Sequence, residues 1–135
     1  MTDFESEQAP REVRNFLFRY VDSVELVRVL LLLHDSPERK WSVDQISAEL
    51  RSSPVAIRKR LDDLYERKVL RKGPDSETHG YEPQNLEIRR SVSELSKYEK
   101  RYPYRVIDLI YARGEDAVRE FANAFTFKKD KAEDK

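Results

Sequence analysis

Two helix-start signals stand close together near the middle of the chain and limit what it can fold into. Ser42 is followed by Gln45 at the spacing of a capping box. Ser53 precedes Pro54, an order that suits the cap and first position of a second helix. The residues between them have room for one short helix and a tight turn at Arg51-Ser52-Ser53. The sequence therefore predicts two short helices that cross at this turn, over residues 42–67.

Apolar residues at helical spacing provide a small shared core for this pair. The expected core residues are Ile46, Leu50, Ile57, Leu61 and Leu64. The opposite side of the second helix then faces outward and carries Val55, Arg58, Lys59 and Asp62.

Composition limits the alternatives around this pair. The 135 residues suit one domain, and 39% of them are charged, above the usual quarter or so, which is typical of solvated amphipathic helices. The absence of cysteine excludes disulfides and thiolate metal sites and is consistent with a cytoplasmic location. The formal net charge of zero argues against binding nucleic acid through bulk charge, although a local basic patch remains open.

The remaining segments predict one domain over residues 11–127. Residues 1–10 are expected to be a disordered lead and residues 128–135 a charged, disordered tail. Helical spacing indicates helices before residue 42 and again over 86–127. Residues 69–83 predict a β-hairpin, because two short strand-like runs flank a stretch rich in turn formers. The expected fold class is mainly α with a small β-hairpin.

The string Trp41-Ser-Val-Asp-Gln-Ile-Ser-Ala-Glu-Leu50, followed by Arg51-Ser-Ser-Pro-Val-Ala-Ile-Arg-Lys-Arg60 and Leu61-Asp-Asp-Leu-Tyr-Glu-Arg-Lys-Val-Leu70, resembles the winged helix-turn-helix transcriptional regulators of the MarR-like and ArsR-like groups. The resemblance covers roughly residues 22–83 and does not select one family. The pattern usually has glycine near position 68, where this chain has Lys68. It implies a winged helix-turn-helix, with the 69–83 hairpin as the wing and added N- and C-terminal helices.

The expected DNA-binding residues lie on the second helix and the wing. The free backbone N–H groups of that helix's first turn suit a phosphate, and a helix of this size fits the major groove. The candidates are Ser52, Ser53, Val55, Arg58 and Lys59 on and before the helix, Arg71 and Lys72 at the base of the wing, and His79 near its tip. Residues 42–72 contain 8 basic and 5 acidic residues, so this segment is positive on a neutral chain.

The expected function is a DNA-binding transcriptional regulator whose helix over residues 54–67 enters the major groove. The alternative is a protein–protein interaction module without DNA binding, since exposed basic residues are often only solvated and the wing carries Asp75 and Glu77. No nucleophile–base, phosphate-loop or metal-ligand pattern is present, so neither an enzyme nor a cofactor is expected. A homodimer through the C-terminal helices is expected, with Tyr98, Tyr102 and Tyr104 as interface candidates. A small-molecule effector stays open, but no residue identifies one.

Overall fold

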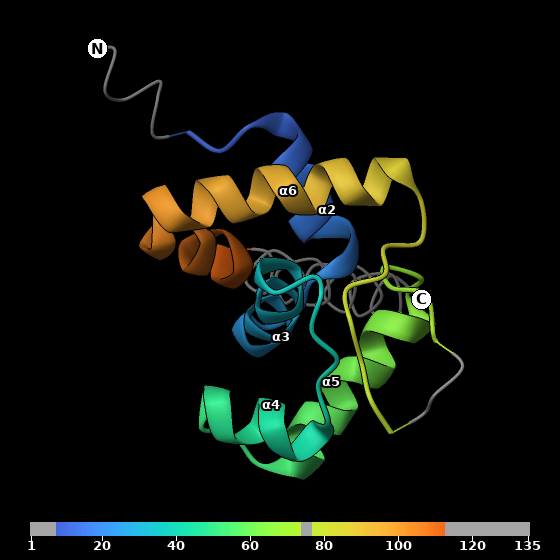
Figure 1. Cartoon of the computed structure of the whole chain (residues 1–135). Coiled ribbons are helices and arrows are strands. Elements are labelled where there is room, and N and C mark those ends of the chain that lie inside the picture. Colours follow the sequence, from blue (N-terminus) through green and yellow to red (C-terminus); the bar gives the residue numbers. More distant parts are fainter. Residues whose placement is uncertain (1–7, 74–76, 113–135) are drawn as a thin grey trace, which may run out of the picture.

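The two central helices of this chain begin where the capping signals predict (Figure 1). The computed structural model describes residues 8–73 and 77–112. The helices are α2 (Arg11–Tyr20), α3 (Val24–Asp35), α4 (Val43–Leu50), α5 (Pro54–Glu66) and α6 (Leu86–Arg101). A further helical stretch covers residues 103–112.

Serine side chains start three of these helices. The Ser23 hydroxyl accepts a hydrogen bond from the Leu26 N–H at the start of α3. Ser42 and Gln45 form the predicted capping box of α4, in which each side chain accepts from the backbone N–H of the other residue. Local sequence signals therefore set the start of each helix that builds the central pair.

The central helix is α3, which packs against α4, α5 and α6, while α2 packs against α6. Its buried residues are Leu26, Val27, Val29, Leu30, Leu31 and Leu33. In Figure 1, α6 crosses α2 at one end of the molecule, and α4 and α5 lie at the other end. This arrangement presents the helix-turn-helix away from the α2–α6 layer.

The predicted core of the α4–α5 pair is confirmed with one adjustment. Ile46, Ile57, Leu61 and Leu64 are buried, whereas Leu50 is only partly buried. The expected C-terminal helices are seen as α6 and residues 103–112, and residues 113–127 lie outside the described part of the chain. Ala9 is buried, so the end of the expected disordered lead joins the core, and the expected tail over 128–135 is also outside the described residues.

The predicted β-hairpin wing is wrong, because residues 8–73 and 77–112 contain no strand or sheet. Two isolated antiparallel bridges occur instead, one between Leu70 and Pro83 and one between Trp41 and His79. Pro83 has no N–H with which to continue a ladder. The backbone of His79 exchanges both of its hydrogen bonds with Trp41, ahead of α4, and not with the opposite arm of the expected hairpin. The mainly α class is retained, and the winged form is not.

Candidate nucleic-acid interface

The turn between α4 and α5 is held by its own serines. Arg51 ends α4 with a left-handed backbone (φ 55°). The Ser52 N–H then donates to the Ser47 carbonyl at 3.1 Å, and the Ser47 hydroxyl donates back to the Ser52 carbonyl. Ser53 caps α5 by accepting from the Ala56 N–H, with Pro54 at the first helical position. The short turn therefore fixes where α5 begins.

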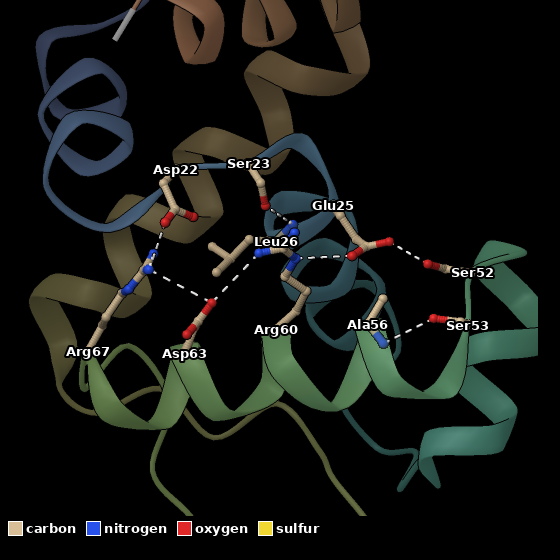
Figure 2. A network of polar contacts seen from close by, with 10 residues as sticks. All are labelled: Asp22, Ser23, Glu25, Leu26, Ser52, Ser53, Ala56, Arg60, Asp63 and Arg67. Carbon is tan, nitrogen blue, oxygen red and sulfur yellow. Dashed lines mark hydrogen bonds and ion pairs between the residues drawn. The ribbon is translucent and has the colours of Figure 1, made fainter. Parts of the chain in front are cut away.

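Polar contacts also tie α5 to the start of α3 (Figure 2). The Ser52 hydroxyl donates to one oxygen of Glu25, and Arg60 Nε donates to the other oxygen at 3.0 Å. These hydrogen bonds, that from Ser52 first and that from Arg60 next, hold the pKa of Glu25 below its ordinary value of 4.5. One carboxylate on α3 thus contacts both the turn and α5.

The far end of α5 is tied in the same way. Arg67 donates from Nη1 to the Tyr20 carbonyl at 2.9 Å and from Nη2 to Asp22 at 2.8 Å. The hydrogen bond from Arg67 lowers the pKa of Asp22. Asp63 lies between Arg60 and Arg67, 3.8 Å from each guanidinium. We call Asp22, Glu25, Ser52, Arg60, Asp63 and Arg67 the polar clamp.

The opposite side of α5 is open to solvent. Val55 is 81% exposed, and Arg58, Lys59 and Asp62 are exposed as predicted. Within the part of the chain that the structure describes, the side chains of Arg58 and Lys59 make no hydrogen bond or ion pair. Because the clamp occupies the other face of the helix, this outer face is the one that α5 can offer to a partner.

The two serines expected to meet a phosphate have different surroundings. Ser53 is exposed, and its hydroxyl is used as the helix cap. Ser52 is partly buried, and its hydroxyl, N–H and carbonyl are all used by Glu25 and Ser47. Ser52 therefore acts as a positioning residue in the clamp, while the backbone N–H of Val55 stays available at the first turn of α5.

The residues expected on the wing differ in their exposure. Arg71 and Lys72 are exposed, and Arg71 Nη2 donates to the Gln84 carbonyl at 3.3 Å. His79 is 6% exposed, and its Nδ1 shares a hydrogen bond with the Tyr65 hydroxyl of α5. The expectation that His79 stands at an exposed tip is therefore wrong, and this side chain faces α5 from within.

Charge on this surface is mixed. Arg60, Asp63 and Arg67 of the segment 42–72 belong to the clamp. The other charged side chains of this segment are 6 basic and 4 acidic ones. A hollow of about 540 Å³ beside the first turn of α5 is lined by Val55, Arg58, Asp44 and Glu77, among others. The two carboxylates there offset part of the positive charge of Arg58.

Sequence reasoning missed the carboxylates of the clamp. Glu25 and Asp22 pair with Arg60 and Arg67, which lie 35 and 45 positions further along the chain. The only signal available in the sequence was that Arg60 and Arg67 fall on the inner side of α5, beside its buried apolar positions.

Comparisons with known proteins add no family. No family model, curated protein or solved structure matches this chain. Among residues 8–73 and 77–112, no group of His, Asp or Glu could hold a metal ion, and no helix is long and apolar enough to cross a membrane.

Proposed function

We propose that this protein binds duplex DNA with the outer face of α5 and regulates transcription. The observation that carries the proposal is the two-sided character of α5. Arg60 and Arg67 are committed to the carboxylates of Glu25 and Asp22, whereas Val55, Arg58 and Lys59 face solvent. A helix with a fixed inner side and an exposed cationic outer side suits the major groove, where Arg and Lys bind guanine edges or the adjacent phosphates.

Further residues support this reading. The Val55 N–H and the exposed Ser53 at the first turn of α5 suit a phosphate oxygen. Arg71 and Lys72 are exposed in the segment after α5 and would contact the backbone beside the groove. No hairpin is needed for these contacts. A cytoplasmic location belongs to the same proposal, because the chain has no cysteine and its proposed partner is intracellular DNA.

The test is a titration of DNA duplexes enriched from a random pool by the wild-type protein, followed by fluorescence anisotropy at two salt concentrations. The double variant Arg58→Ala with Lys59→Ala should bind at least about tenfold more weakly. If both side chains contact phosphates, the slope of log affinity against log salt should also become smaller by about one per lost contact.

The matched control removes two neighbouring cations elsewhere. Arg89→Ala with Arg90→Ala changes the same charge on exposed positions of α6, so its DNA affinity should stay near the wild-type value. Equal affinity of the α5 double variant and the wild type would contradict the proposal, and so would a wild-type protein that shows no salt-dependent binding.

A protein-interaction module is the second candidate. The hollow beside α5 favours it, because Asp44 and Glu77 would repel phosphates, while Val55 and Arg58 suit the side chains of a protein partner. Removal of these two carboxylates, in Asp44→Asn with Glu77→Gln, separates the candidates. The double variant should strengthen DNA binding if α5 enters the groove, and should leave the protein without DNA affinity if the face serves a protein partner.

A further inference from the structure

A second hollow, of about 380 Å³, lies between the segment before α4, the side of α5 and the residues that follow α5. Its lining includes Lys40, Tyr65, Arg71, His79, Gly80 and Glu82. Its volume falls in the range of about 300–1,000 Å³ that is typical of small-molecule sites. Of the expected DNA-binding residues, Arg71 and His79 belong to it.

Among the described residues that line this hollow, the cations are Lys40 and Arg71 and the carboxylate is Glu82. Lys40 Nζ forms an ion pair with Glu82 at 2.8 Å, which commits that carboxylate. Arg71 uses one guanidinium nitrogen on the Gln84 carbonyl and has further N–H groups to offer. A planar guanidinium binds a carboxylate or phosphate through two parallel hydrogen bonds, so the lining suits an anion.

Two further features shape the wall of the hollow. The end of the Lys40 side chain lies close against the backbone at Gly80, where a Cβ atom would be 2.9 Å from Lys40 Cδ and Nζ. Burial, with a smaller effect of Glu82, raises the pKa of Tyr65 to about 12. The phenol therefore stays protonated at neutral pH, and its hydrogen bond with His79 Nδ1 holds both rings in the wall.

We propose that this hollow binds a small anion carrying a carboxylate or phosphate group, held by Arg71 and Lys40. The site adjoins both helices of the proposed DNA-binding unit. Tyr65 belongs to α5, and His79 forms its backbone bridge with Trp41, just ahead of α4. An anion bound here would act as an effector of DNA binding, and this role rests on the proposed function. The binding of the anion itself does not depend on that function.

Glycine amides provide a direct test, because the chain has three glycines and two of them, Gly73 and Gly80, line the hollow. The full chain, labelled with ¹⁵N-glycine, is titrated separately with inorganic phosphate, with succinate and with the neutral diamide of succinate, all at matched ionic strength. We expect saturable shifts of the Gly73 and Gly80 signals with an anion. Saturation by phosphate alone or by succinate alone identifies which of the two groups the site takes.

Two results would overturn the site. One is the absence of a saturable shift with both anions. The other is an equal shift with the neutral diamide, which would show that charge does not matter.

A pair of neighbouring variants tests the residue that holds the anion. Arg71→Gln should weaken binding at least about tenfold, since it removes the guanidinium fork. Lys72→Gln removes the same charge from an exposed neighbour that does not line the hollow, and it should leave the anion affinity within about twofold. An equal loss of anion affinity in the two variants would show that only the net charge of the protein matters, and this would refute the site. Circular dichroism melting curves verify that both variants are folded.

Failure of this site and failure of DNA binding are distinguishable. The α5 variant Arg58→Ala with Lys59→Ala should keep its anion affinity, because neither residue lines the hollow. The DNA affinity of the wild type, measured with and without the saturating anion, should then change at least about threefold. An unchanged DNA affinity would leave an anion site without the effector role and would refute that part of the inference.

Discussion

At the residue scale, Glu25 joins both the α4–α5 turn and α5 itself to α3. It accepts hydrogen bonds from Ser52 in the turn and from Arg60 on α5 (Figure 2). Both contacts lower its pKa, so the ionised form is favoured by folding. The orientation of α5 therefore depends on a side chain of α3 that no DNA-contact pattern would select.

Replacement of Glu25 by Gln should lower the free energy of unfolding by about 1.5–3 kcal/mol at neutral pH, because it removes charge-assisted hydrogen bonds and leaves Arg60 partly unpaired. Urea denaturation at pH 7 measures this difference. Glu49→Gln is the matched control, since Glu49 is exposed on α4 and its side chain bonds to no described residue.

The loss in Glu25→Gln should also depend on pH. The folded-state pKa of Glu25 is lowered, so its contribution is complete above the unfolded value near 4.5 and disappears as the pH falls through the folded value. Denaturation curves of wild type and variant should therefore converge below about pH 4.5. A difference that stays constant down to pH 2 would contradict the assigned cause.

The contrast between Ser53 and Glu25 indicates which individual residues sequence reasoning can assign. Ser53 could be assigned as a cap because its partner is Ala56, within the same turn of helix. Arg60 could not be assigned to Glu25, because the pair exists only after α3 and α5 pack together. The same limit applies to His79, whose position in a turn-rich segment predicts exposure although its ring contacts Tyr65.

At the element scale, the end of α5 has the geometry of a Schellman motif. The Val69 N–H donates to the Leu64 carbonyl and the Lys68 N–H to the Tyr65 carbonyl. Lys68 has φ 61°, a left-handed backbone that favours glycine. Glycine would suit this backbone, and this chain has a lysine there.

Replacement of Lys68 by Gly should raise the free energy of unfolding by about 0.5–1 kcal/mol, because relief of the left-handed strain exceeds the added flexibility of the unfolded chain. Thermal unfolding followed by circular dichroism measures the gain. Lys68→Ala keeps the Cβ atom and should not stabilise, so equal stabilisation by Ala and Gly would contradict the strain argument.

Helices were easier to predict than the hairpin for a local reason. The caps of α4 and α5 are encoded within a few residues of each start. The two arms of the segment after α5 pair only at the Leu70–Pro83 bridge, through the Arg71 N–H to the Glu82 carbonyl and the Gln84 N–H to the Val69 carbonyl, whereas His79 pairs with Trp41. Bridges of this kind depend on which segment lies nearby in the folded molecule, and periodicity does not encode that.

At the scale of the whole molecule, the α2–α6 layer and the helix-turn-helix lie at opposite ends (Figure 1). The sequence predicted the helices of both ends. It did not predict that α6 packs on α2, because the helices have apolar faces of similar character and the pattern does not tell which of these faces pair. Of the tyrosines considered for an interface, Tyr98 is buried, Tyr102 is partly buried and Tyr104 is 79% exposed. Tyr104 and the exposed Tyr111 are therefore the remaining candidates.

We expect a homodimer through residues 103–112, because exposed aromatic side chains are enriched at interfaces and paired DNA half-sites require two copies. Sedimentation equilibrium should give about twice the chain mass of 16.1 kDa for the wild type. Tyr104→Glu with Tyr111→Glu should shift it to the monomer mass. Leu86→Glu, a control at an equally exposed apolar position at the start of α6, should leave the dimer intact. A wild type that sediments as a monomer would exclude this assembly.

The two isolated bridges have a consequence for how this protein can vary. A ladder would force alternating side chains onto opposite faces over its whole length. Here, among the described residues, the Trp41–His79 and Leu70–Pro83 pairs are the backbone bridges of the segment after α5. Exposed positions of this segment that neither line the hollow nor belong to the proposed DNA contacts can be exchanged without shifting α4 or α5. Divergence among descendants of this chain should therefore accumulate at those positions first, while the helices keep their geometry.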